Sequence, residues 1–150
     1  MSELTNLYQD VILDHSKRPR NFHTIVDADH HANGYNPLCG DKVTIYLTLV
    51  DDRITDISFQ GSGCAISTAS ASILTETLKG KTRKEAEALF EEFHNLVTGQ
   101  PTNSAGGPAL GKLAVFSGVC EFPVRVKCAS LAWHTLKSAL EDSPAVTSSE

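Results

Sequence analysis

Residues 42–60, with the sequence KVTIYLTLVDDRITDISFQ, contain the pattern that decides the fold. In the segment 42–50, apolar side chains recur at every second position, and this period of two predicts a half-buried β-strand. The letters DDR predict a tight turn, and the segment 54–60 then predicts the second strand of an antiparallel hairpin. The sequence therefore predicts one pair of neighbouring antiparallel strands.

Helical patterns flank this hairpin on both sides. We expect helices from Ser2 to near Pro19, from just after Cys64 to Gly80, from Thr82 to Gly99, and over roughly residues 125–141. Thr82 and Glu85 have the spacing of a capping box, which indicates where the third helix begins. Residues 21–38 are polar and mixed and predict a loop, whereas residues 113–119 form a short apolar segment.

The composition is that of a folded domain. Of the 150 residues, 41% are hydrophobic and 21% are charged, which predicts a single domain over residues 1–150 with a flexible tail at 142–150. The formal net charge of -5 argues against a nucleic-acid-binding protein, since such proteins usually present a basic surface. No apolar run approaches the roughly 20 residues of a membrane span, and no secretory signal is visible. We therefore expect a cytoplasmic protein with reduced thiols that binds neither membrane nor nucleic acid.

The four cysteines, at positions 39, 64, 120 and 128, form no C-x-x-C pair, so neither a zinc knuckle nor a thioredoxin-type motif is present. Cys39 precedes a strand, Cys64 lies in a glycine-rich strand-to-helix turn, and Cys128 lies near the start of the last helix. Thiolates are favoured at such loop ends and helix N-termini, and these three could converge at one edge of the sheet. Three thiolates suit zinc or iron–sulfur chemistry, and Asp41 would supply a fourth ligand.

Each of these residues also has a simpler explanation. Cys120 follows an apolar segment and is most simply a small buried hydrophobic residue. The letters CGD at 39–41 also fit a turn capped by the aspartate side chain. Cys64 alone fits a core position as well as it fits a ligand. From the residues alone, these alternatives remain open.

Four pieces of the sequence together resemble one known family. They are LYQDVILDHSKRPRN, NPLCGD, FQGSGCAISTASAS and FPVRVKCASLAW, in this order over most of residues 5–137. The sequence resembles the IscU/SufU family of iron–sulfur cluster assembly proteins, and most closely its SufU branch. Two features favour this branch. Cys64 and Cys128 are 64 positions apart, with extra length around residues 82–110, and Lys127 stands where scaffold-type members carry a histidine.

The resemblance implies a fold and a metal site. The fold is α+β and SufE/IscU-like, with a small antiparallel sheet of about three strands and helices packed on one face. The resemblance implies that Cys39, Asp41, Cys64 and Cys128 hold a zinc ion, and that Cys120 is outside the ligand set. Cys39 matches the position of the family's sulfur acceptor.

The resemblance also implies an activity, namely zinc-dependent sulfur transfer. A SufS-like cysteine desulfurase would pass persulfide sulfur to Cys39, and the chain would pass it on to downstream iron–sulfur assembly proteins. In the mechanism that we hypothesise, the desulfurase supplies a replacement ligand, the freed Cys39 thiolate attacks the persulfide, and Asp41 keeps the site anchored. Arg125 and Lys127 would offset negative charge and steady the thiolate, although salt bridges facing solvent are the simpler role for both.

Two other functions use the same residues. In the first, the four ligands hold a transient [2Fe–2S] cluster, which the protein assembles and transfers as a scaffold, since carboxylate ligation makes a cluster labile. In the second, zinc is structural and the chain is an adaptor without catalytic activity. We expect the chain to be an enzyme as a sulfurtransferase that acts with a cysteine desulfurase, and the metal content separates zinc from iron and sulfide.

Overall fold

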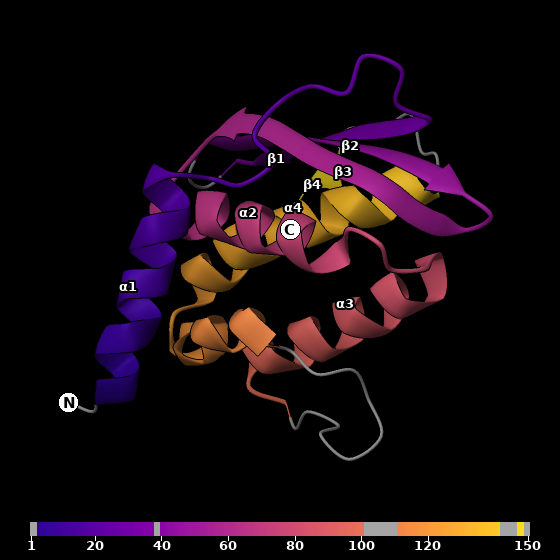
Figure 1. Ribbon diagram of the computed structural model, residues 1–150. Coiled ribbons are helices and arrows are strands. Elements are labelled where there is room, and N and C mark those ends of the chain that lie inside the picture. The colour runs from indigo at the N-terminus through magenta and orange to yellow at the C-terminus, as the bar shows by residue number, and fades with distance from the viewer. Residues whose placement is uncertain (1–2, 38–39, 101–110, 142–146, 149–150) are drawn as a thin grey trace.

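The computed structural model describes residues 3–37, 40–100, 111–141 and 147–148 (Figure 1). In chain order, the elements are α1 (Glu3–Lys17), β1 (His30–Asn36), β2 (Asp41–Val50), β3 (Arg53–Ser62), α2 (Ala65–Leu78), α3 (Arg83–Thr98), the 3-10 helix η1 (Gly111–Glu121), α4 (Pro123–Leu140) and β4 (Thr147–Ser148). The predicted start of the first helix at Ser2 lies outside the described residues. Its predicted end is confirmed, because α1 ends at Lys17, two residues before Pro19.

The predicted hairpin is confirmed as β2 and β3. The two strands pair antiparallel from Val50 opposite Arg53 back to Lys42 opposite Ser62. Asp51 and Asp52 form the turn, and both have positive φ, 51° and 62°. A two-residue hairpin turn with left-handed residues matches the twist of its strands, and aspartate tolerates this conformation better than most side chains do.

The prediction of a loop over residues 21–38 is wrong for its second half, which contains β1. This strand pairs antiparallel with β2, and its inward positions are Ala32, Gly34 and Asn36. These small or polar residues hide the apolar alternation that sequence reasoning uses. A Cβ atom on Gly34 would lie 1.9 Å from Oγ1 of Thr135 in α4, so this position has room for glycine only. The strand is thus shaped by the helix that it packs against.

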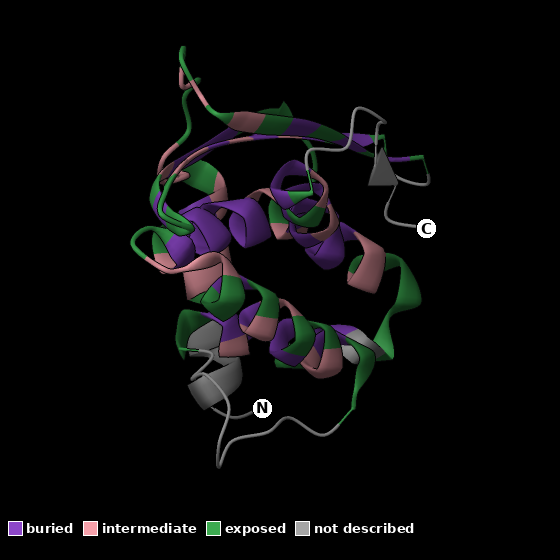
Figure 2. Cartoon of the chain, turned by 90° about the vertical axis from the view of Figure 1, so that its right-hand side faces the viewer, coloured by how far each residue is buried: buried purple, intermediate pink, exposed green. Residues whose placement is uncertain are grey.

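The helices lie on one face of the sheet, in two layers. Figure 1 shows α2 and α4 directly beneath the strands, with α3 and η1 farther from the sheet and α1 at the side. The strand order is β3-β2-β1-β4, with β4 parallel to β1 over two residues. Figure 2 shows that the buried residues are concentrated between the sheet and the helices. The predicted fold class, an α+β structure with three antiparallel strands and helices on one face, is confirmed, and β4 is a short addition.

The core lies both between the sheet and the helices and between the helices themselves. On the sheet side, Ile45 and Leu47 of β2 are fully buried. On the other side, the rings of Phe93 in α3 and Trp133 in α4 stack with centroids 4.9 Å apart. α2 joins the two regions, since the Ser70 hydroxyl donates a hydrogen bond to the carbonyl oxygen of Ala129 in α4, at 2.6 Å. This contact fixes α2 and α4 relative to each other one residue from Cys128.

The helix boundaries follow their capping residues. α3 has the predicted capping box, in which Thr82 and Glu85 exchange side-chain-to-backbone hydrogen bonds, and it ends at Gly99 with φ of 78°. α4 begins at Pro123, two residues earlier than predicted, because proline is well suited to the first position of a helix. The apolar segment 113–119 lies within η1.

The predicted tail over residues 142–150 falls mostly outside the described residues, apart from β4. The extent of the single domain remains a prediction. None of the described helices combines the length and the apolar character that crossing a bilayer requires.

Candidate metal centre

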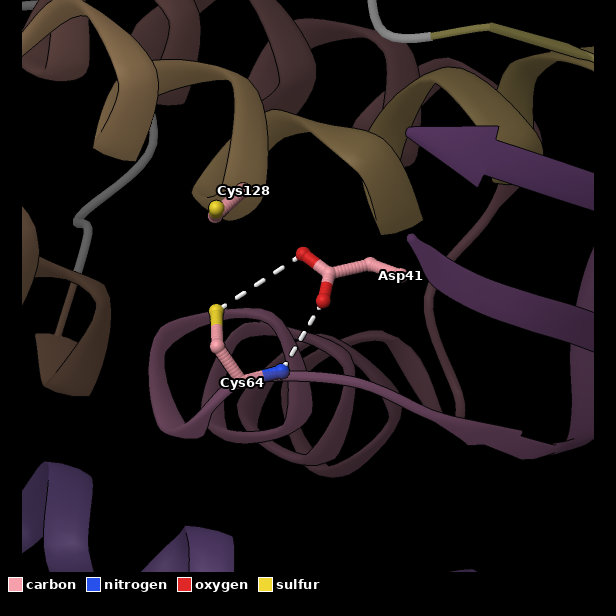
Figure 3. Close-up of side chains that lie close together, drawn as sticks. All are labelled: Asp41, Cys64 and Cys128. Atoms are coloured by element: carbon pink, nitrogen blue, oxygen red, sulfur yellow. Dashed lines mark hydrogen bonds between the residues drawn. The ribbon is translucent and has the colours of Figure 1, made fainter. Parts of the chain in front are cut away.

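Three potential metal ligands converge where β2, α2 and α4 meet (Figure 3). They are Asp41, Cys64 and Cys128, and one ligand atom from each lies within 4.8 Å of the other two. Asp41 is the first residue of β2, Cys64 precedes α2, and Cys128 lies in the second turn of α4. The structure therefore brings together three of the four ligands that the resemblance implies.

Asp41 is held in place by the residue at the start of α2. Its Oδ1 accepts a hydrogen bond from the backbone N–H of Cys64, at 2.9 Å, and its Oδ2 lies 3.7 Å from the Cys64 Sγ. Asp41 is only 2% exposed. Within the described ranges, it forms no ion pair with a lysine, arginine or histidine. A buried carboxylate without a cationic partner is costly, so this position favours a bound cation.

Cys64 is the N-cap of α2. Its Sγ accepts a hydrogen bond from the backbone N–H of Ser67, at 3.4 Å, as a capping serine or aspartate would do through oxygen. The free N–H groups at a helix N-terminus favour negative charge, so they stabilise a thiolate at this position. Cys64 is also exposed, which leaves one side of the site open to solvent.

The glycines before Cys64 let the chain pass close to β2. Gly61 has φ of 151°, and a Cβ atom there would lie 2.1 Å from the Lys42 carbonyl oxygen. A Cβ atom on Gly63 would lie 2.8 Å from Oδ1 of Asp41. The glycines of the sequence GSGC therefore allow a backbone conformation that places the N–H of Cys64 against the carboxylate of Asp41.

Cys128 forms the buried side of the site. It is 3% exposed, and the Asn36 side-chain amide at the end of β1 donates to its Sγ at 3.8 Å. Asn36 is itself fully buried and pairs with Asp41 across the β1–β2 ladder. Hydrogen bonds to a ligand sulfur orient it and tune its charge, so Asn36 supports the site from behind.

The donor set fits a zinc ion. Zinc binds thiolates at about 2.3 Å and carboxylate oxygens at about 2.0–2.2 Å, so sulfur and oxygen ligands of one tetrahedral ion lie about 3.6 Å apart. The 3.7 Å between the Sγ of Cys64 and the Oδ2 of Asp41 is close to this value. Two thiols and one carboxylate also suit iron–sulfur chemistry.

The other predicted site residues have different outcomes. Cys39, the fourth ligand, lies outside the described residues, as does the side chain of Cys120. Arg125 is exposed, and its guanidinium lies over the ring of Phe122, 5.3 Å from the centroid. Lys127 is half-buried and borders a groove of about 350 Å³ that also contains His134. Roles for Arg125 and Lys127 toward the ligands remain predictions.

Sequence reasoning missed the contributions of Asn36 and Gly63. Asn36 is part of the NPLCGD motif, but the motif does not indicate that the Asn36 amide contacts Cys128, which is 92 positions away. Gly63 is visible as a turn former, but its closeness to Asp41 is a property of the folded chain.

The sequence also matches known proteins. Residues 7–129 match the family described as NifU-like N terminal domain. The iron–sulfur cluster assembly scaffold protein IscU of Streptococcus pyogenes serotype M1 is 41% identical over 143 residues, which cover 95% of this chain and 88% of that protein. The zinc-dependent sulfurtransferase SufU of Bacillus subtilis is 36% identical over 139 residues, which cover 93% of this chain and 92% of that protein.

Solved structures share the fold. A crystal structure from Fervidobacterium islandicum AW-1, described as an iron–sulfur cluster assembly scaffold for the SUF system, matches with a TM-score of 0.81 and 36% identity, over 93% of this chain and 96% of that chain. The N-terminal part of a NifU-like protein from Brucella abortus matches with a TM-score of 0.82 over 94% of this chain and 96% of that chain, and at 21% identity it supports the fold alone. The chain belongs to the NifU-like N-terminal domain family, within its IscU/SufU group.

Proposed function

We propose that this chain is an iron–sulfur cluster assembly protein that acts as a zinc-dependent sulfurtransferase. It would accept persulfide sulfur from a cysteine desulfurase and pass it on for cluster biogenesis. The observation that carries the proposal is the buried Asp41 carboxylate, which has no cationic side-chain partner among the described residues and lies beside the thiols of Cys64 and Cys128. Family membership and the similarity to the Bacillus subtilis sulfurtransferase support the same function.

We assign the zinc ion to Asp41, Cys64, Cys128 and Cys39. Zinc would keep the thiolates deprotonated at neutral pH while protecting them from oxidation. Asn36 and Ser67 would hold the two described sulfur atoms in place through their N–H groups. The described residues on either side of positions 38–39 lie at the site, because Asn36 and Asp41 pair with each other and the N–H of Gly40 donates to the Asn36 carbonyl oxygen, at 2.8 Å.

The transfer itself is a thiol–persulfide exchange. The Cys39 thiolate would attack the terminal sulfur of the desulfurase persulfide and form a new sulfur–sulfur bond. The sulfur–sulfur bond of the partner would break, and the desulfurase cysteine would leave as a thiolate. Cys39 would then carry the persulfide, with no net oxidation and no additional reactant.

A scaffold function is the second candidate. It is favoured by the names of the Streptococcus pyogenes relative and of the Fervidobacterium islandicum structure, both described as assembly scaffolds. In that case the same residues would hold a [2Fe–2S] cluster as cargo. A structural zinc adaptor would need the same ion but no acceptor cysteine.

One set of measurements tests these functions together. The chain is purified anaerobically, its zinc, iron and sulfide are quantified, and desulfurase turnover is measured with zinc-loaded, metal-free and Asp41→Ala protein. Sulfur transfer predicts about one zinc per chain, stimulation by the zinc-loaded form, and weak stimulation by the other two. Equal stimulation by all three would contradict a zinc-dependent transfer. A cluster that moves to an apo-acceptor would instead support the scaffold.

A further inference from the structure

A buried histidine connects α1 to the middle of α2, far from the metal centre along the helix. His15 in α1 is 1% exposed, and Ser72 in α2 is fully buried. The Nδ1 atom of His15 lies 2.7 Å from the Ser72 hydroxyl, across 57 positions of sequence. Because both side chains are inaccessible to solvent, this pair cannot act as a base and nucleophile on a substrate. Its role must lie in how α1 is held.

The Ser72 hydroxyl has a second partner that sets the direction of these hydrogen bonds. It accepts a hydrogen bond from the backbone N–H of Arg20, at 2.8 Å. In the described part of the chain, His15 Nδ1 is the only other group that contacts this hydroxyl. We therefore assign the single proton of Ser72 to Nδ1, the acceptor within its reach there, and in this tautomer Nδ1 is unprotonated. The other ring nitrogen, Nε2, is buried and has no hydrogen-bond partner there.

Among the described residues, the charges around His15 leave no free carboxylate to pair with a positive imidazole. Asp14 forms an ion pair with Arg20, at 2.7 Å, and Glu76 forms one with Lys112, at 2.8 Å. Both carboxylates near His15 are thus already occupied by cations. Burial, followed by the charges of Arg20 and Lys112, lowers the pKa of His15 below its ordinary value of 6.5, against smaller opposing effects of Glu76 and Asp14.

We propose that His15 is a pH-sensitive latch that holds α1 and the following turn, at Arg20 and Asn21, on α2. The latch is closed only while the imidazole of His15 is neutral. Protonation would turn Nδ1 from an acceptor into a donor, so the Ser72 hydroxyl would face two donors and lose the acceptor of its own proton. It would also bury a positive charge beside two cations. The turn would be released together with the helix, because it is bonded to the same part of α2: the Asn21 side-chain amide donates to the Thr75 hydroxyl, at 3.1 Å.

The direction of the pH dependence follows from the lowered proton affinity. Well above about pH 6.5 the histidine is neutral in both the folded and the unfolded chain, and the latch is fully closed. As the pH falls below that value, the unfolded or released form binds the proton more readily, so docking of α1 weakens. The weakening stops once the pH is below the pKa of His15 in the docked state.

Hydrogen exchange on the zinc-loaded full chain tests the latch. Amide exchange is followed by mass spectrometry from pH 7.5 to 5.0 and corrected for the intrinsic pH dependence of exchange. The protection of α1 should fall by about tenfold for each pH unit between 6.5 and the pKa of docked His15. The protection of α4, which carries Cys128, should stay constant. Constant protection of α1, or an equal loss in α4, would overturn the proposal.

Two variants separate the latch from general acid sensitivity. His15→Asn offers an uncharged side chain with an oxygen in place of Nδ1, and it should abolish the pH dependence of α1 protection. The exposed His23 supplies the matched control, and His23→Asn should behave like the original chain. If His15→Asn does not fold, an NMR titration of the histidine rings in the unmodified chain decides instead. His15 must then titrate below pH 6.5 and together with the loss of α1 protection; titration at an ordinary pKa with α1 still protected would refute the latch.

Discussion

The carboxylate of Asp41 accepts a hydrogen bond from the backbone N–H of Cys64, at 2.9 Å, and this bond joins the first residue of β2 to the N-cap of α2. Two candidate ligands are thereby positioned by each other before any ion is bound. The cost is a buried negative charge, since Asp41 has no cationic side chain beside it within the described residues. A bound metal ion would remove that cost.

Asp41→Asn should have opposite effects on the metal-free and the zinc-loaded protein. The amide oxygen can still accept from the Cys64 N–H, but the buried charge is gone, so the free energy of unfolding without metal should be unchanged or higher. With zinc, the variant should lose about 1.4 kcal/mol of metal-dependent stabilisation for each tenfold loss of affinity. Urea denaturation at fixed free zinc measures both values, with the exposed Asp27→Asn as control. Equal zinc-dependent stabilisation in Asp41→Asn and the original chain would show that Asp41 is not a ligand.

Gly63→Ala should weaken metal binding more than it weakens the fold. The new methyl group would lie 2.8 Å from Oδ1 of Asp41 and would push the carboxylate away from the Cys64 N–H. Displacing a group that orients a ligand typically reduces metal affinity by about 10–100-fold. Competition with a zinc chelator measures the affinity. Gly118→Ala is the matched control because a Cβ atom there meets nothing within 4 Å, and equal affinities of the two variants would contradict this account.

Cys39→Ala should abolish stimulation of the desulfurase if Cys39 is the sulfur acceptor. The alanine cannot form the new sulfur–sulfur bond, whereas zinc could still bind Asp41, Cys64 and Cys128 with lower affinity. Desulfurase turnover is measured by alanine release under excess reductant. Cys120→Ala is the control for the loss of a cysteine outside the predicted ligand set, and this variant should still stimulate the desulfurase. Normal stimulation by Cys39→Ala would move the acceptor role to another thiol.

Gly34→Ala should destabilise the contact between β1 and α4. The added methyl would lie 1.9 Å from Oγ1 of Thr135, and such overpacking typically costs about 1–3 kcal/mol. The double variant Gly34→Ala with Thr135→Ala should recover part of this loss, since the clashing oxygen is removed. Urea denaturation of the four proteins in this cycle gives the coupling free energy. Strictly additive effects would show that β1 and α4 do not meet as the structure has them.

The elements that could be predicted from sequence are those with strong local signals. The hairpin was predictable because Ile45 and Leu47 repeat with period two, and α3 because Thr82 and Glu85 form a capping box. β1 could not be predicted, because its inward side chains are set by neighbours on other elements. Gly34, for example, is small because Thr135 of α4 lies against it.

The chemical types of the candidate ligands were predictable from the sequence, but the side chains that hold the ligands and helices in place were not. The ligand types followed from the thiol and carboxylate residues and from the resemblance, and the fold places Asp41, Cys64 and Cys128 together. The amide of Asn36 behind Cys128 and the pairing of His15 with Ser72 depend on contacts across 92 and 57 positions of sequence. No local pattern encodes such distances, so these contributions emerge only from the packed chain.

The order of the ligands along the chain affects how the protein is made. Asp41 and Cys64 belong to the first half of the sequence, but Cys128 lies in the last described helix. Since a chain leaves the ribosome from its N-terminus, α4 emerges after the strands β1, β2 and β3 and the helix α2. A growing chain therefore presents an incomplete set of the candidate donors until α4 docks, so a metal ion held by Asp41, Cys64 and Cys128 would be acquired late in biosynthesis.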